Sequence, residues 1–182
     1  MTIEEYNKVK DLPYLKYVVY LQKKYGMTNG PYFVFSRTGE WVYISTTSSK
    51  KFLMKNEKIR RLQDGLLIHH VGEDALYNLS DKYKADLYPK IYQEPNLLCY
   101  CDLLEHLLLH IMIYEFTAHK RKIPKHLISD VRWCIDGTYP NGDLHNSPAT
   151  YTHQDLTKYK EAVTQNLDVV KLLLDRIKKD TN

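Results

Sequence analysis

The sequence has few cysteines and no long apolar run. Its three cysteines, Cys99, Cys101 and Cys134, are a small and odd number, which is typical of free thiols in a reducing compartment. No CxxC pair occurs, so the sequence does not support a zinc knuckle built from cysteines. The longest apolar stretches, such as residues 107–114, are far too short to span a bilayer. We therefore expect neither a disulfide scaffold nor a membrane protein.

The first ten residues also lack an apolar segment, so we expect no signal peptide and a cytoplasmic location. Internal repeats and low-complexity segments are absent as well. The chain is instead apolar and aromatic, because 43% of its 182 residues are hydrophobic and 16 are tyrosines. A chain of this composition can bury a core, so we expect one folded domain over residues 1–182.

The net charge is mildly basic, at +4, which permits a polyanionic partner without requiring one. Basic residues are clustered, however. Residues 50–61 contain six Lys or Arg and one acid, and residues 119–126 contain four Lys or Arg and no acid. Either cluster alone could be a solvated face. From the two clusters we select these candidate phosphate contacts: Arg60, Arg61, Lys120 and Arg121.

Hydrophobic periodicity predicts an α+β fold. The predicted elements are a helix over residues 12–25 ended by Gly26, a hairpin joining residues 32–35 to 41–44, short strands at 66–71 and 96–101, a helix from Asp102 to about Ala118, and an amphipathic C-terminal helix over 155–179. Residues 72–95 are interpreted as a long functional loop. Residues 124–152 contain several Gly and Pro turn signals and are predicted to form an ordered, turn-rich excursion.

The best-defined element is the helix after Asp102. Asp102 and Glu105 have the spacing of a capping box, and leucines follow at helical intervals. His106 and His110 are four residues apart in this helix, so they share one face and can bind one metal ion. The zinc-protease motif requires Glu directly after its first His, and Leu107 stands at that position, so that reading is excluded.

Two adjacent histidines, His69 and His70, lie near the end of the predicted strand at residues 66–71. Successive side chains of a strand point to opposite faces, so one histidine can face a metal ion while the other faces a substrate. A hydrolase needs both functions, since one group holds the ion and another activates water. The remaining histidines are expected to be ordinary surface or satisfied residues: His119, His126, His145 and His153.

In this order of elements, the segments 68–71, 96–98 and 105–110 resemble the HNH, or ββα-metal, endonuclease family. The likeness is greatest to the subgroup that includes the nuclease colicins. The resemblance covers under a third of the chain. It implies a ββα-metal catalytic core over residues 64–116, with the N-terminal helix and hairpin and the C-terminal helix as additions.

The resemblance also implies a role for each residue of the pattern. His70 would be the general base that deprotonates the attacking water. His69, His106 and His110 would bind one divalent ion, whether Mg²⁺, Mn²⁺, Ni²⁺ or Zn²⁺. Asn96 would brace the loop so that His70 keeps its orientation.

The chain departs from the family pattern in three ways. The stretch between His70 and Asn96 is longer than in compact members, Asn96 and His106 are slightly further apart than is commonest, and the cysteine pairs of many members are absent. The loop acids Glu73 and Asp74 could replace or supplement a histidine ligand.

The expected function is hydrolysis of DNA, without contact to a membrane. A restriction or phage-type defence enzyme, a nicking enzyme and a toxin all fit the pattern. One active site per chain predicts a homodimer if both strands are cut. The alternatives are a ribonuclease, a non-catalytic nucleic-acid-binding module with a structural metal, and a metal-free binding domain. His70 separates the nuclease from the module with a structural metal, because a purely structural site needs no second histidine beside His69.

Overall fold

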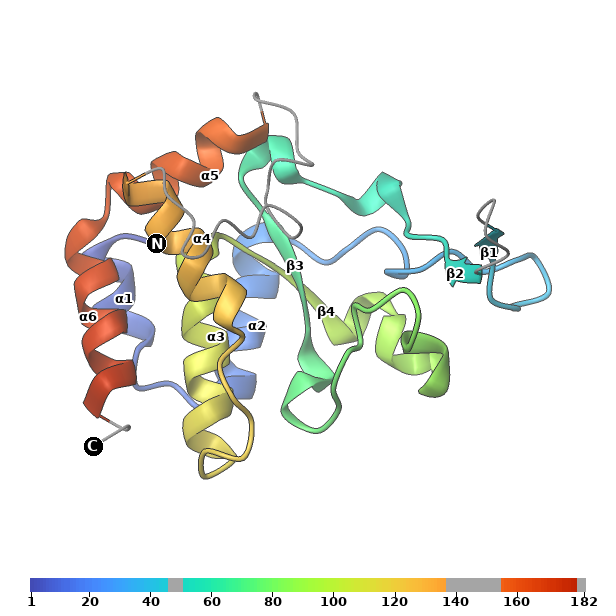
Figure 1. Cartoon of the computed structure of the whole chain (residues 1–182), viewed down its shortest axis with the longest axis horizontal. Helices are drawn as coiled ribbons and strands as arrows, with labels where there is room; N and C mark the ends of the chain where they lie inside the picture. The colour runs from blue at the N-terminus through green and yellow to red at the C-terminus, as the bar shows by residue number, and fades with distance from the viewer. Residues whose placement is uncertain (46–50, 137–154, 180–182) are drawn as a thin grey trace. The chain divides into compact units, whose positions relative to one another are not determined.

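The computed structural model describes residues 1–45, 51–136 and 155–179. Within these residues the chain is mixed α and β, with six α-helices and two two-stranded sheets (Figure 1). The mixed class predicted from the sequence is thereby confirmed. The chain separates into two compact units: unit 1 contains residues 1–19, 61–67 and 101–182, and unit 2 contains residues 20–60 and 68–100. That residues 1–182 act as one domain stays a prediction.

Unit 1 is helical. Its central helix, α3 (Leu103–Phe116), packs against α4 (Lys125–Asp136), α5 (Asp155–Thr164) and α6 (Leu167–Lys179), and α1 (Ile3–Val9) packs on α6 (Figure 1). Between Leu103 and Ile113, every side chain of α3 except His106 is buried. A helix that is apolar on all sides belongs in a core, so unit 1 is organised around α3.

The first turn of α3 forms as predicted. The Asp102 carboxylate accepts the Glu105 N–H at 2.8 Å, and the Glu105 carboxylate accepts the Asp102 N–H at 2.7 Å, which completes a capping box. The predicted N-terminal helix is also present as α2 (Tyr14–Tyr25). Gly26 follows it with φ of 80°, the left-handed conformation that ends many helices.

The C-terminal helix over residues 155–179 is two helices, so the prediction of one continuous helix is wrong. α5 ends at Thr164 and α6 begins at Leu167. The Thr164 hydroxyl donates to the carbonyl of Lys160 at 3.1 Å, and the Asn166 amide donates to the carbonyl of Ala162 at 2.9 Å. Side chains that bond to backbone carbonyls compete with the helical ladder. The apolar spacing continues across the break, so periodicity could not reveal it.

The prediction of a turn-rich excursion over residues 124–152 is wrong for its first part. Residues Lys125–Asp136 form α4, which buries Leu127, Val131 and Cys134 on one face. Pro124 comes directly before the helix, where a missing N–H costs nothing. Residues 137–152 lie outside the described part of the chain.

Unit 2 consists of short strands and 3₁₀ turns. β1 (Tyr43–Ser45) pairs antiparallel with β2 (Lys51–Leu53). The predicted hairpin around Gly39 is present in part: Phe35 and Trp41 form an isolated antiparallel bridge, and the N–H groups of Ser36 and Val42 donate to the carbonyls of Glu40 and Val34 at 2.8 and 3.1 Å. Residues 72–95 contain 3₁₀ turns and neither an α-helix nor a strand, which agrees with the predicted long loop.

The second sheet joins β3 (Leu67–His70) to β4 (Leu98–Cys101). Asp102 then connects β4 directly to α3, so the chain follows the predicted order of strand, strand and helix. None of the described helices combines the length and apolar character that crossing a bilayer requires.

Candidate metal centre

The two histidines of α3 face each other across one helical turn. The Nε2 atoms of His106 and His110 are 3.3 Å apart, and the ring centroids are 4.9 Å apart. Burial and, to a smaller extent, the neighbouring His126 lower the pKa of His110 to about 3. His110 is therefore neutral at physiological pH, which is the form of imidazole that binds metals. Two converging imidazole nitrogens on a rigid, capped helix can act as a pair of metal ligands.

His126 was expected to be an ordinary histidine, but it belongs to the surroundings of this pair. It lies in the first turn of α4, and burial lowers its pKa. This role could not be predicted for His126, because the sequence pattern did not predict α4.

His69 and His70 are completely buried at the end of β3, in unit 2. The Nε2 atom of His70 lies 3.0 Å from the Oε1 atom of Gln93. The Gln93 amide nitrogen donates to the carbonyl of Leu79 at 3.1 Å, which fixes the orientation of the amide. The Nε2–H of His70 therefore donates to Gln93, and Nδ1 is its basic nitrogen. Burial lowers the pKa of His70 to about 4, so the ring is neutral.

One carboxyl group, that of Glu73, faces both of these histidines. It lies 3.7 Å from Nδ1 of His69 and 3.8 Å from Nδ1 of His70, just beyond hydrogen-bond distance. Burial raises the pKa of Glu73 to about 7. A Cβ on the preceding residue, Gly72, would lie 2.7 Å from the ring of Tyr92, so this close approach requires glycine.

An aromatic ring and a lysine lie on another side of His70. The Tyr32 ring meets the His70 ring edge-on, with centroids 4.5 Å apart. The ammonium of Lys55 lies 5.2 Å from the centroid of the Tyr32 ring, and its charge is a smaller contribution to the low pKa of His70. Unit 2 thus places a cation close to His70.

Asn96 lies in the 3₁₀ turn Pro95–Leu97, directly before β4. Its backbone carbonyl accepts from the Gln22 amide at 3.3 Å. Among the described contacts, the side chain that forms a hydrogen bond with His70 is Gln93, three residues before Asn96. Sequence reasoning missed Gln93, because it lies in an irregular loop where no spacing rule applies. The bracing role of Asn96 stays a prediction.

The four basic candidates lie in different surroundings. Arg60 is ion-paired with Glu57, and Arg61 Nε lies 2.8 Å from an oxygen of Asp64. Exposed pairs of this kind contribute little stability, so both guanidinium groups can exchange their partner for a phosphate. Lys120 is exposed, and the backbone N–H of Arg121 donates to the Thr117 hydroxyl at 3.2 Å.

Comparison with known proteins gives no relative for this chain. No protein-family model, no curated protein and no solved structure matches it. The function must therefore be argued from the site itself.

Proposed function

We propose that this chain is a metal-dependent endonuclease of the HNH type that hydrolyses DNA phosphodiester bonds. The observation that carries the proposal is the convergence of His106 and His110 on α3 at 3.3 Å. His69 is the third ligand that we assign, and these three histidines form a group that could hold a metal ion. Three protein ligands leave a coordination position for substrate or water, as in catalytic rather than structural sites.

The donor set fits a divalent transition metal. Imidazole nitrogens suit Zn²⁺ and Ni²⁺, whereas Mg²⁺ prefers oxygen ligands. His110 is neutral because of its burial, so no proton competes with the metal at physiological pH. When bound, the ion would neutralise charge on the scissile phosphate and on the leaving oxygen.

The residues of unit 2 supply the proton chemistry in this proposal. His70 Nδ1 takes a proton from the attacking water, while Nε2–H remains bonded to Gln93. Gln93 thus fixes the tautomer in which Nδ1 is the base. Lys55 carries a positive charge close to His70 and is a further phosphate contact beside the basic clusters. Because His70 is fully buried, substrate binding must admit water to Nδ1.

The competing function is a non-catalytic module with a structural metal. The complete burial of His69 and His70 favours it, since closed sites exclude water. The two functions differ in one measurable respect, because only the enzyme requires His70 for turnover while metal binding persists.

The test is cleavage of supercoiled plasmid with Ni²⁺, Zn²⁺, Mn²⁺ or Mg²⁺, with a labelled RNA in parallel. We expect the wild-type protein to cut DNA and EDTA to abolish the cutting. His70→Ala should slow cleavage by about 10²- to 10⁴-fold, the usual contribution of a general base. Equilibrium dialysis should show that this variant still binds metal.

His119→Asn is the matched control. It removes an exposed imidazole of unit 1. The backbone φ of His119 is 67°, a conformation that asparagine tolerates. Cleavage should be unchanged in this variant. Equal cutting by His70→Ala and wild type would overturn the general-base assignment. A metal-loaded protein that cuts neither DNA nor RNA would support the structural-metal alternative.

A further inference from the structure

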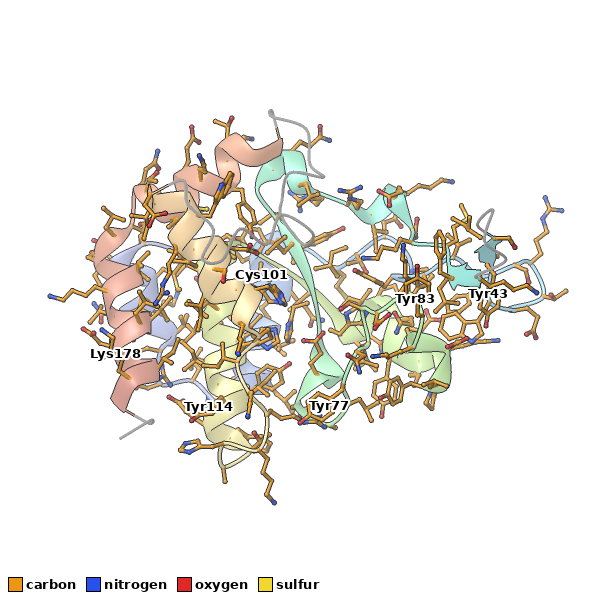
Figure 2. The ribbon with its side chains drawn as sticks, viewed as in Figure 1. Tyr43, Tyr77, Tyr83, Cys101, Tyr114 and Lys178 are labelled. Carbon is orange, nitrogen blue, oxygen red and sulfur yellow. The ribbon has the colours of Figure 1, made fainter. Side chains whose placement is uncertain are left out.

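A second feature of unit 2 is a partly exposed pair of aromatic rings, one on β2 and one beside it. The ring of Phe52 on β2 lies edge-on to Tyr83, with centroids 5.8 Å apart, and Lys82 places its ammonium 4.0 Å from the Phe52 centroid. The Leu53 N–H donates to the carbonyl of Lys82 at 2.8 Å, which holds this turn against the strand. Tyr83 is 53% exposed and lies beside the hairpin (Figure 2).

Similar pairs of rings and lysines occur twice more in unit 2. The ammonium of Lys90 lies 5.8 Å from the Phe35 ring and 5.9 Å from the Trp41 ring, and Lys55 lies 5.2 Å from Tyr32. About one significant cation–π contact is expected in a segment of this size, so three lysines near aromatic rings exceed the expected number.

The rings are connected by contacts that lead to His70. Phe35 touches Trp41 at 4.7 Å, Trp41 touches the buried Phe33 at 6.3 Å, and Phe33 touches Tyr32 at 4.9 Å between centroids. Tyr32 in turn meets His70 at 4.5 Å. Tyr32 and Trp41 are half-buried and pack against the core at Phe33, so this series of ring contacts runs through the core and ends at the proposed general base.

Two of the three lysines of this surface remain for an outside anion, whereas Lys90 lies 3.7 Å from a carboxylate oxygen of Glu40. Within the described part of the chain, neither Lys82 nor Lys55 is ion-paired with an acid; both ammonium groups lie over rings. More than half of Tyr83 is exposed, so Lys82 does not cover the whole side chain. The surface therefore combines cations with rings that a flat ligand can reach.

We propose that this ring–lysine surface binds single-stranded nucleic acid. The surface consists of these residues: Tyr32, Trp41, Phe52, Lys55, Lys82, Tyr83 and Lys90. Unpaired bases stack on Tyr83 and Trp41 while the lysines contact phosphates, as in sites that bind single strands without sequence preference. A duplex fits less well because its bases are already stacked on one another. The inference rests on the proposed function, which makes nucleic acid the polymer that is bound. It adds that this surface binds an unpaired strand.

The test is fluorescence anisotropy in EDTA, where no cleavage occurs. The ligands are labelled oligo-dT and oligo-U of about 20 nucleotides, longer than most single-strand sites, and a DNA duplex of the same length. We expect both single strands to bind more tightly than the duplex, and their ratio separates DNA from RNA. Tyr83→Ala should weaken single-strand binding about tenfold, and Tyr83→Phe, which keeps the stacking ring, less than twofold.

Tyr77→Ala is the matched control, because Tyr77 is 54% exposed in the same unit and lies apart from the hairpin, in the loop after β3 (Figure 2). It should leave binding unchanged. Lys82→Gln should make the plot of log affinity against log salt concentration less steep, by the amount that corresponds to about one phosphate contact. Equal effects of Tyr83→Ala and Tyr77→Ala would overturn the proposal. Duplex binding that is tighter than single-strand binding and is unchanged by Tyr83→Ala would overturn it as well.

Binding and cleavage are measured separately, so the two proposals can fail separately. Tyr83-dependent binding without any metal-dependent cleavage would retain the single-strand surface and overturn the nuclease. Cleavage that depends on His70, with no effect of Tyr83→Ala on binding, would do the reverse.

Discussion

At the scale of single residues, the decisive contact is the hydrogen bond between His70 and Gln93. We expect Gln93→Leu to lower kcat by about 10- to 100-fold, the usual cost of losing a partner that orients a site histidine. The buried Nε2–H of His70 would lose its acceptor, and the ring would no longer be fixed with Nδ1 as the base. Single-turnover cleavage, with metal affinity measured in parallel, checks this prediction.

Gln93→Glu supplies the conservative comparison. It keeps an oxygen opposite His70, so it should recover part of the activity that Gln93→Leu loses. KM for the nucleic acid should stay within about twofold in both variants, since Gln93 contacts protein groups rather than substrate. A Gln93→Leu enzyme with unchanged kcat would show that the contact only fills space.

Single residues also show what sequence reasoning could reach in this site. The spacing of His106 and His110 predicts their convergence, because the helical repeat alone fixes it. Gln93 and His126 could not be predicted in this way. Gln93 reaches His70 through an irregular loop, and His126 lies on a helix whose sequence was read as turns.

At the scale of elements, α3 depends on its capping box. Asp102→Ala should lower the free energy of unfolding by at least about 0.5–2 kcal/mol, because the Glu105 N–H loses its acceptor and the buried ammonium of Met1 loses the carboxylate with which it is ion-paired. Asp102→Asn retains a capping oxygen and should fall between the alanine variant and wild type. Urea denaturation measures both changes, and the m-values should be the same in all three proteins. An alanine variant as stable as the asparagine variant would contradict a role for the cap.

The elements that were predicted correctly are those with local signals at their ends. α3 has Asp102 and Glu105 at its start, and α2 has Gly26 after its last residue. The break between α5 and α6 has only Thr164 and Asn166 to mark it, while the apolar spacing runs on. Side-chain competition for carbonyls depends on rotamers, which periodicity does not report.

At the scale of the whole molecule, the three proposed ligands come from both compact units. His106 and His110 belong to unit 1, and His69 belongs to unit 2. An ion held by all three would stabilise both units together, because the site is lost when either unit unfolds. An ion held by α3 alone would stabilise unit 1 only.

Calorimetry distinguishes these two cases. Saturating Zn²⁺ or Ni²⁺, at about 100 times its dissociation constant, should add about 2.7 kcal/mol of stability, or roughly 5–10 °C in Tm for a chain of this size. We expect the whole unfolding endotherm to shift, and EDTA to reverse the shift. His69→Ala and His106→Ala should each abolish it, while His119→Asn should retain it. If His69→Ala kept the full shift, the ion would bind to α3 alone, and His69 would lose its place in the proposed metal centre.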